Sequence, residues 1–507
     1  MFIDKSIFYK IAVIAVIKSA LFFYFASNFQ DNWPKSEIVN SIFIRTGDTS
    51  SYLTPIENMM DGNGYGRAAG AKENKTEFLP FAGRMPGFLP VYGPLYYFFG
   101  EKTAGFLLVI IQFLIGVLAT YVLAWLSGNL FSSERIFWIT LVGFSLSSFV
   151  SIFDHYGFAE SLATSFLIFS CGFLYLNSKY FSAKMSILSG IFACWALFMR
   201  PALGINLILF PLFWFFLQIR KKEFTFLTWT KNCILFLLPF LICEMIWVIR
   251  NEKAIGAFIP LEASYEESYK EVYSPQQMAI QKLIIAWGGS MIKWDEKSDA
   301  HWFIYEQADD AGIHFSADQF TSSYSADSLY VLRQLFRASM DTNLVRMERN
   351  FLAEQTVSMT RRLYNSYKSE KPFRFYVTSK LILLKQFLFV GTVNHLPFPK
   401  YADMTALQKT IKSGYLLLYY LVLIGGITGI VLVLVQKKLH LSSMIVCIPV
   451  AQIFIHPVWF GYIEHRYFVP VYPFMLMFAA YALNYFSLLL KKEKKQNQSL
   501  KNILFFI

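Results

Sequence analysis

Residues 104–128 read AGFLLVIIQFLIGVLATYVLAWLSG and contain no charged side chain. A helix needs about 20 mostly apolar residues to cross the hydrocarbon core of a bilayer, so this stretch is long enough to span a membrane. Comparable stretches predict spans at 7–27, 104–128, 136–152, 157–177, 185–199, 202–219, 232–249, 412–435, 440–459 and 466–490. The predicted fold is an all-α polytopic membrane protein with about ten transmembrane helices.

The composition agrees with this fold. Of the 507 residues, 55% are hydrophobic and 16% are charged, whereas about 25% of the residues in a typical soluble domain are charged. The formal net charge is +12, but Lys and Arg occur in short runs such as RKKEF, QKKLH and KKEKK between apolar stretches. These runs indicate membrane orientation and argue against a nucleic-acid partner.

The positive-inside rule assigns the two faces of the membrane. With the N-terminus inside and ten spans, the basic runs fall on the cytoplasmic side. Lys18 interrupts the first apolar stretch and no small-residue cleavage site follows, so this stretch is interpreted as a retained span. Residues 371–390 would reverse the later spans if they crossed the membrane. They are therefore predicted to form an amphipathic outer-surface helix, with Arg374, Lys380 and Lys385 towards water.

This topology divides the chain into three parts. Residues 1–250 form an N-terminal transmembrane module with a first outer loop at 28–103, residues 251–411 form a mostly helical extracytoplasmic region, and residues 412–507 form the C-terminal transmembrane helices and a basic cytoplasmic tail. In the second part, apolar side chains recur at helical spacing and predict an amphipathic helix with further outer-face juxtamembrane helices. These side chains are Leu329, Leu332, Leu335, Phe336, Met340, Leu344, Met347 and Phe351.

The first outer loop contains TGDTSSYLTPIENMMDGNGYG at 46–66. A helix is predicted to begin at Thr54 as N-cap, with Pro55 at its first position and Glu57 completing a capping box. Gly62 is expected to end it. Asp48 then precedes this helix and has no evident structural duty. It is either a solvated loop acid, or a cap of a preceding turn, or a functional carboxylate.

Four arginines are predicted near the same face. Arg84 lies on a proline-rich, extended stretch, and Arg200 follows a helix of only about 24 Å, shorter than the bilayer core of about 30 Å, so it is expected in a recessed cavity. Arg250 and Arg466 emerge at the same face. Each is either part of an anion site or an interfacial charge that reaches the headgroups, and Arg466 alternatively forms a structural ion pair with Glu464.

The outer turn before the fourth span contains Asp154, His155 and Glu160. Glu160 would begin a span, and an ionisable group so close to the membrane indicates a cavity or a charged partner. Ordinary interfacial polarity is the alternative interpretation. A histidine beside acids also allows a divalent metal, although the spacing is a weak signal for one.

These residues resemble the GT-C membrane glycosyltransferases, a superfamily that includes the protein O-mannosyltransferases and the aminoarabinose transferases of lipid A. The resemblance begins with Asp48, Tyr52, GNGYG at 62–66 and the Arg84-x-Pro86 element. It continues through DHYGFAESL, FMRPALG, VIRNEKAIGAFIPL, KPFRFYVTSKLILLKQFL and EHRYFVPVYPF, and so covers nearly the whole chain as short, ordered matches.

Two positions depart from the family pattern. Pro55 is expected to break the helix that commonly runs on from the acidic residue. Thr49, and not Glu, follows Asp48, so the mannosyltransferase subgroup is not claimed.

The resemblance implies a reaction and roles for the site residues. A sugar would move from a polyprenyl-phosphate donor to an acceptor with inversion of configuration, and Asp48 would act as general base. The remaining roles implied are phosphate binding by Arg84, Arg200, Arg250 and Arg466; an acceptor or second acidic site at Asp154, His155 and Glu160; and support of the donor or loop by Tyr52, Tyr65 and His465. No cofactor or metal ligand is assigned.

The expected partners are the lipid-linked donor, membrane lipid and an acceptor that is a lipid, a glycan or a protein. The expected location is a bacterial inner membrane with the site facing the periplasm or cell exterior, and an endoplasmic reticulum membrane is the alternative. Two other functions fit the pattern less well. A lipid-linked glycan polymerase or ligase would place its essential groups in the later loop, and a transporter or flippase would place ionisable residues near the bilayer midplane.

Overall fold

The computed structural model describes residues 5–68, 78–180, 182–221, 225–262, 275–291, 298–305, 315–341, 343–389, 396–436, 441–461 and 463–505. Almost all regular structure in these residues is helical. One two-stranded antiparallel pair, β1 (Gly66–Ala68) with β2 (Phe78–Pro80), joins Gly66 to Pro80 in register. The predicted all-α class is confirmed.

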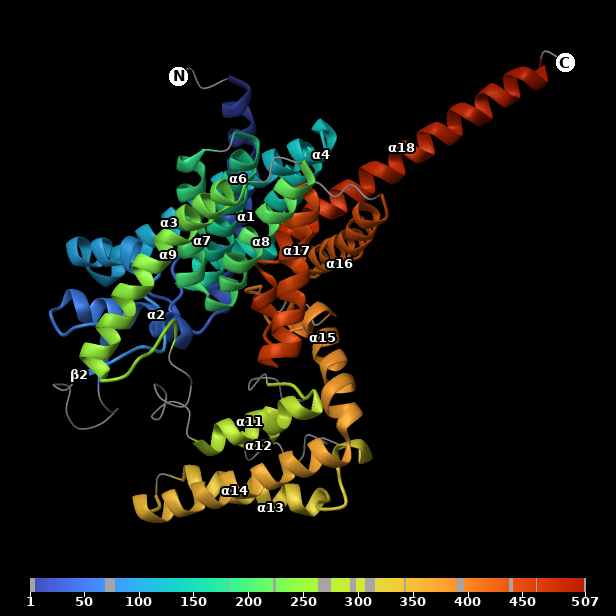
Figure 1. Cartoon of the computed structure of the whole chain (residues 1–507). Helices are drawn as coiled ribbons and strands as arrows, with labels where there is room; N and C mark the ends of the chain where they lie inside the picture. The colour runs from blue at the N-terminus through green and yellow to red at the C-terminus, as the bar shows by residue number, and fades with distance from the viewer. Residues whose placement is uncertain are drawn as a thin grey trace.

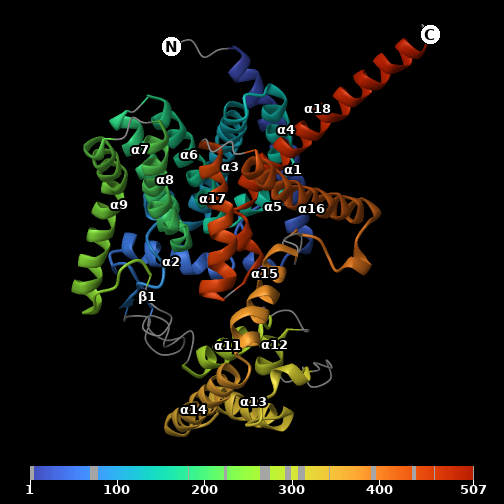
Figure 2. The same ribbon diagram turned by 45° about the vertical axis from the view of Figure 1, so that its right-hand side comes forward.

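The apolar helices pack into one bundle (Figures 1 and 2). They are α1 (Lys5–Asn32), α3 (Leu89–Leu130), α4 (Glu134–Ser145), α5 (Ser148–Ser151), α6 (Ala159–Tyr180), α7 (Ala183–Met199), α8 (Ile205–Lys221), α9 (Phe226–Ile255), α16 (Ala406–Val435), α17 (Leu441–Phe454) and α18 (Tyr472–Phe505). Among the described residues, 6 helices are long and apolar enough to cross a membrane: α1, α3, α6, α9, α16 and α18. The protein is an integral membrane protein.

Several predicted spans correspond to shorter helices. α7, α8 and α17 are apolar but shorter than 18 residues. The predicted span at 136–152 is interrupted, because α4 ends at Ser145 and the chain continues through α5 and the short turn η2 (Ile152–His155). Both figures place the two termini on the same side of the bundle, which an even number of crossings requires.

Short helical turns and a second group of helices complete the described structure. The turns are η1 (Lys35–Glu37), η3 (Pro201–Gly204), η5 (Ala317–Gln319), η6 (Arg374–Thr378), η8 (Tyr401–Asp403), η9 (Ile455–Phe460) and η10 (His465–Phe468). The second group is α2 (Gly47–Met60), α11 (Pro275–Trp287), α12 (Asp299–Ile304), α13 (Ala326–Met340), α14 (Arg346–Glu370) and α15 (Ser379–Phe389).

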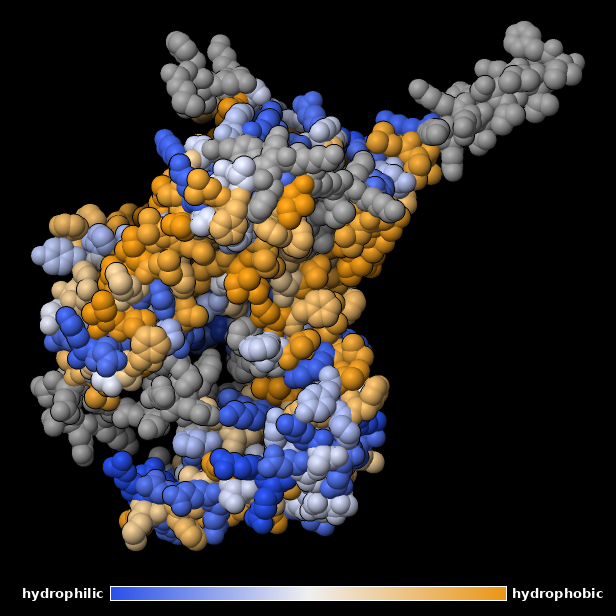
Figure 3. All heavy atoms as spheres, in the orientation of Figure 1, coloured by the Kyte–Doolittle hydropathy of each residue, from blue (hydrophilic) through white to orange (hydrophobic). Residues whose placement is uncertain are grey.

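Helices α11 to α14 form a smaller body with its own core at the end of the molecule opposite the termini (Figures 1 and 2). Its buried residues include Trp287, Trp302, Leu332, Phe336 and Leu363. Figure 3 shows that the surface of the bundle is mainly hydrophobic and that of this smaller body mainly hydrophilic. We call the smaller body, formed by the described residues of 275–370, the helical outer domain, after the face predicted for it.

The apolar pattern at 329–351 does not form one helix. α13 ends at Met340, the next residue has an extended backbone, and α14 begins at Arg346. Leu329 and Phe336 are buried in the outer domain, whereas Met347 is 84% exposed. The apolar pattern therefore crosses a break between two helices.

The described residues 371–389 do not form a helix that lies flat on the surface, as was predicted for 371–390. Figures 1 and 2 show α15 running from the end of α14 towards the bundle. Leu383 and Phe387 are buried in the main core. Lys385 is exposed as expected, but Arg374 and Lys380 are only partly exposed, because this segment connects the two cores.

Helix α2 is anchored to the bundle by apolar packing and by an ion pair. Leu53 and Ile56 are fully buried. The Arg45 guanidinium makes two contacts of 2.7 Å with the Glu57 carboxylate, and the Tyr92 hydroxyl of α3 donates to the same carboxylate at 2.7 Å. These contacts fix α2 against the first part of α3.

The same contacts correct the predicted start of the helix. Thr46, and not Thr54, is the N-cap, and its hydroxyl accepts a hydrogen bond from the Thr49 amide at 3.3 Å. The Thr54 hydroxyl instead accepts from Arg45 at 2.9 Å. The capping box is absent because Arg45, which lies outside the helix, binds both Thr54 and Glu57.

Pro55 lies inside α2 and does not end it. A proline in a helix interior removes one amide donor and often breaks the helix, but α2 continues to Met60 because its buried face holds it. The departure from the family pattern expected at Pro55 is therefore wrong. Asp48 lies in the first turn of α2, and not ahead of it.

The packing of α16 against α18 depends on a glycine. A Cβ atom at Gly429 would lie 2.0 Å from the carbonyl oxygen of Phe478. We expect Gly429→Ala to destabilise the protein by about 1–3 kcal/mol, because backbone cannot yield as a flexible side chain can. Gly414→Ala is the control in the same helix, since nothing lies within 4 Å of its Cβ position. Thermal unfolding of the solubilised protein measures both, and equal midpoints would contradict this packing.

Candidate active site

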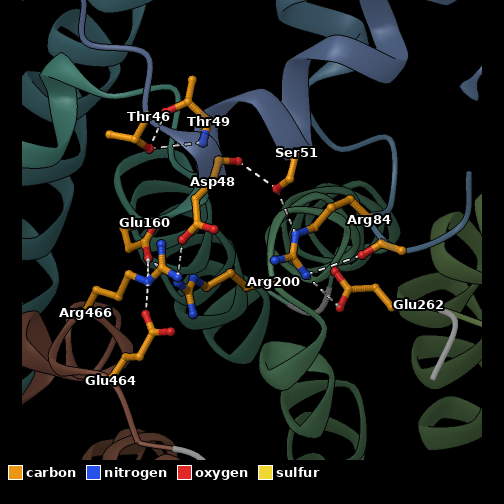
Figure 4. Close-up of polar contacts among 11 residues, drawn as sticks. Thr46, Asp48, Thr49, Ser51, Arg84, Glu160, Arg200, Glu262, Glu464 and Arg466 are labelled. Atoms are coloured by element: carbon orange, nitrogen blue, oxygen red, sulfur yellow. Dashed lines mark hydrogen bonds and ion pairs between the residues drawn. The ribbon is translucent and has the colours of Figure 1, made fainter. Parts of the chain in front are cut away.

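Five segments of the chain meet at the edge of the bundle that faces the outer domain. They are the start of α2, the segment between β2 and α3, the start of α6, the junction of α7 with η3, and η10 before α18. Figure 4 shows that their charged side chains point towards one another. The predicted residues Asp48, Arg84, Glu160, Arg200 and Arg466 all belong to this group.

Asp48 lies in the first helical turn of α2, where the helix dipole favours a negative charge. Its Oδ2 atom is 2.6 Å from an Nη2 of Arg466. The side chain is still 47% exposed, so one edge of the carboxylate can be reached by a substrate. The Ser51 hydroxyl donates to the Asp48 carbonyl at 2.6 Å and fixes the backbone of this turn.

The surrounding arginines keep Asp48 ionised. Partial burial raises the pKa of Asp48, but the positive charge of Arg466, followed by those of Arg84 and Arg200, lowers it. The net pKa lies below its ordinary value of 3.8. Asp48 is therefore a carboxylate at neutral pH.

Glu160 lies beneath Asp48 at the start of α6, and its side chain is 0% exposed. It forms an ion pair with Nη2 of Arg200, and its Oε1 is 3.5 Å from Nε of Arg466. Glu464 also pairs with Arg466, as the alternative interpretation of Arg466 predicted. Because Glu160 is enclosed by two guanidinium groups, its position is that of an internal counter-charge and not of an exposed acceptor site.

Arg84 is held from two sides. Its Nε donates to the Ser51 hydroxyl at 3.3 Å, and its Nη1 lies 3.6 Å from Oε2 of Glu262. The guanidinium also lies over the ring of Tyr52, 5.0 Å from its centroid. Burial raises the pKa of Glu262, and Arg84 and Arg200 only partly offset this, so the net pKa lies above its ordinary value of 4.5. Glu262 is thus more readily neutralised than an ordinary glutamate.

A cavity of about 380 Å³ adjoins this network. It is lined by Tyr52, Arg84, Arg200, Pro201, Ala202, Glu262, Met278, Gln281, Lys282, Ile285, His456, Arg466 and Tyr467. Three guanidinium groups therefore share one cavity with several apolar side chains. Asp48 does not line the cavity, but its carboxylate contacts Arg466, which does.

The structure does not bring Asp154 and His155 to this cavity. Asp154 is buried, with Oδ2 3.7 Å from the ammonium of Lys18 in α1. His155 is also buried, its Nδ1 lies 3.0 Å from the carbonyl oxygen of Ile42, and its ring stacks on Phe22. Both side chains contact α1 or the loop that follows it, Asp154 through an ion pair and His155 through a hydrogen bond and ring stacking.

Arg250 and Tyr65 lie at a second cavity, of about 420 Å³. Arg250 donates to the carbonyl oxygens of Phe81 and Tyr65, and its guanidinium covers the rings of Tyr65 and Trp247. The Tyr65 hydroxyl donates to the Arg84 carbonyl at 3.1 Å, so Tyr65 supports the loop that carries Arg84. The side chain of His465 lies outside the described part of the structure.

Sequence reasoning missed Glu262, Lys282, His456 and Tyr467 as cavity residues. Tyr467 directly follows Arg466 in the sequence, so its position near the cavity could have been predicted from that of Arg466. Glu262 lies 12 residues after Arg250, near the start of the outer region, but nothing in its pattern shows that it faces Arg84. Among the described residues, no group of three or more His, Cys, Asp or Glu side chains could hold a metal ion.

The buried charge of Glu160 gives a test of the network. Glu160→Gln leaves Arg200 and Arg466 without their shared partner, and loss of one member of a buried pair costs about 3–5 kcal/mol. Glu101→Gln is the matched control, because that carboxylate is 50% exposed and such pairs contribute about 0–1 kcal/mol. We expect the thermal midpoint to fall clearly only for Glu160→Gln. Equal midpoints for the two variants would contradict the counter-charge role.

No family model matches the sequence, and no curated protein sequence matches it either. Among solved structures, the chain is similar to the Archaeoglobus fulgidus oligosaccharyltransferase in the apo form, with a TM-score of 0.48 and 14% identity over 98% of this chain and 52% of that one. It thus spans about half the length of that protein. It is also similar to ArnT from Cupriavidus metallidurans in the apo state (TM-score 0.35, 12% identity, 93% of this chain and 76% of that one) and bound to undecaprenyl phosphate (TM-score 0.35, 11% identity, 93% and 77%).

Proposed function

We propose that this protein is an inverting glycosyltransferase of the GT-C type, which moves a sugar from a polyprenyl-phosphate donor to an acceptor on the outer face of the membrane. One observation carries the proposal. The ionised, half-exposed carboxylate of Asp48 contacts an arginine that lines a cavity together with two further arginines. The site would therefore hold a base that can take the proton of the acceptor next to arginines that can bind an anionic leaving group.

The cavity suits the donor in both its charge and its apolar lining. Arginine binds phosphate with paired donors and never loses its charge, so Arg84, Arg200 and Arg466 would hold the phosphate. Met278 and Ile285 would contact the first isoprene units. The three arginines contact Glu262, Glu160 and Asp48, and the contact of Arg84 with Glu262 is the longest of these, at 3.6 Å. The donor phosphate would therefore displace Glu262 from its arginine more readily than the other two carboxylates.

The reaction then follows as a single displacement. The acceptor hydroxyl or amine attacks the anomeric carbon from the side opposite the phosphate, and its proton passes to Asp48. The bond between the anomeric carbon and the phosphate oxygen breaks at the same time, and the bonding pair leaves with the phosphate, which the arginines hold. The configuration at the anomeric carbon is therefore inverted. General-base assistance of this kind contributes about 10²- to 10⁴-fold to the rate.

Binding of the donor would also prepare the base. In the empty site Arg466 lowers the pKa of Asp48, which makes Asp48 a weak proton acceptor. When the guanidinium turns to the phosphate, an opposite charge leaves the carboxylate and a new negative charge approaches it. Both changes raise the pKa of Asp48, so the base becomes stronger only when the donor is present.

The first test is Asp48→Asn. We expect transfer by the purified protein, with a panel of polyprenyl-phosphate sugars, to fall by about 10²-fold or more, while binding of the donor persists. Asp61→Asn is the control, because it is the same substitution at the exposed C-cap of the same helix. The product should have inverted configuration. Undiminished transfer by folded Asp48→Asn, or retention of configuration, would refute the mechanism.

The second test concerns the phosphate site. Arg84→Gln should weaken donor binding by about tenfold, which corresponds to 1.4 kcal/mol and to loss of a charge-assisted hydrogen bond, with a smaller effect on acceptor binding. Arg67→Gln on β1 removes the same charge from a residue that does not line the cavity and should bind donor normally. If Arg84→Gln impairs the acceptor more than the donor, the assignment is wrong.

A further inference from the structure

The helical outer domain has a large groove of its own. A hollow of about 890 Å³ lies between α14, the start of α11 and the end of α13. One face of α14 forms its main wall, since Arg346, Arg349, Ala353, Val357 and Arg361 line it at spacings of three or four residues. This groove is separate from the cavity beside Asp48, with which it shares no lining residue.

The groove carries a strong positive charge. It is lined by Arg346, Arg349, Arg361 and Arg362, against the single acid Glu354. Over the residues that the structure describes, these arginines have no ion pair with a carboxylate. The Nε of Arg349 is buried and has no hydrogen-bond partner there. The arginines of the candidate active site, by contrast, all have carboxylate partners. The groove therefore leaves its positive charge available to a ligand.

The positive charge is distributed along the groove. At one end, Arg346 and Arg349 belong to the first turn of α14, whose N-cap Val345 makes no side-chain cap, so the free amides of the helix add to the attraction for an anion. Arg361 and Arg362 follow 12 or more residues later, about 18 Å along the helix at its rise per residue. A ligand that satisfies both ends must carry negative charges at intervals along its length.

The rest of the lining is suited to a carbohydrate. Gln276, Ser339, Asn350, Ser358 and Asn365 also line the groove and provide neutral hydrogen-bonding groups, which match sugar hydroxyls. In Figures 1 and 2, α13 and α14 lie at the end of the molecule far from the apolar bundle. That position is unsuited to headgroups of the membrane in which the bundle lies.

We propose that this groove binds an anionic glycan, a chain of sugars with recurring carboxylates or phosphates. The proposal rests on the proposed function in one respect: if the protein transfers sugars, the glycan in the groove is the distal part of its acceptor. Binding itself requires neither the donor nor Asp48.

The test is direct binding to the full-length protein in detergent or nanodiscs, with oligogalacturonate as the carboxylate-bearing probe and a phosphate-bearing oligosaccharide as the second. Neutral maltooligosaccharide, inorganic polyphosphate and poly-glutamate are the comparison ligands. Both charged glycans should bind, and longer oligomers should bind more tightly than those too short to bridge the two arginine pairs. Affinity should fall steeply with added salt.

Variants locate the binding. Arg349→Gln should weaken binding of oligogalacturonate about tenfold, and the double variant Arg349→Gln with Arg361→Gln should weaken it further. Lys368→Gln removes one positive charge from an exposed position on the same helix outside the groove and should bind normally. Unchanged affinity in the double variant would overturn the proposal. So would equal affinity for poly-glutamate or polyphosphate, which would show that the groove recognises charge alone.

The two proposals can be refuted independently of each other. If Asp48→Asn loses transfer and the groove variants bind glycan normally, the groove assignment fails and the active site stands. If the groove variants lose glycan binding but wild-type protein transfers no sugar from any donor, the proposed function fails and the groove stands.

Discussion

The guanidinium of Arg466 joins three parts of the chain that are far apart in the sequence. It contacts Asp48 at the start of α2, Glu160 at the start of α6, and Glu464 just before η10. A charge buried this deeply is stable only when opposite charges surround it. The positions of α2, α6 and the segment before α18 therefore depend on one another, and the candidate active site exists only when all three are in place.

Each arginine of the site has a carboxylate partner before any ligand arrives. Arg84 faces Glu262, Arg200 faces Glu160, and Arg466 faces Asp48, Glu160 and Glu464. Under the proposed function, a phosphate would enter by displacing one carboxylate from its arginine. The outer-domain groove has the opposite design, because its arginines have no carboxylate partner among the described residues.

The sequence was sufficient for the fold class and for most of the membrane helices, because long uncharged stretches have one physical solution in a bilayer. The sequence was less reliable where a residue in a local pattern binds a residue outside that pattern. Thr54 and Glu57 have the spacing of a capping box, yet Arg45 binds both, so α2 begins at Gly47. The stripe at 329–351 has helical period, yet it crosses a break between α13 and α14.

The sequence by itself determined that the chain spans a membrane. It also identified Asp48, Arg84, Arg200 and Arg466 as candidates for one pocket, and Glu160 as a candidate for a second acidic site. Only the tertiary structure decided which charges meet. It separated Arg250, Asp154 and His155 from the cavity, placed Glu262 opposite Arg84, and made Glu160 a buried counter-charge. The physical reason is that hydropathy and helix period are properties of neighbouring residues, whereas an ion pair depends on how helices far apart in the sequence pack together.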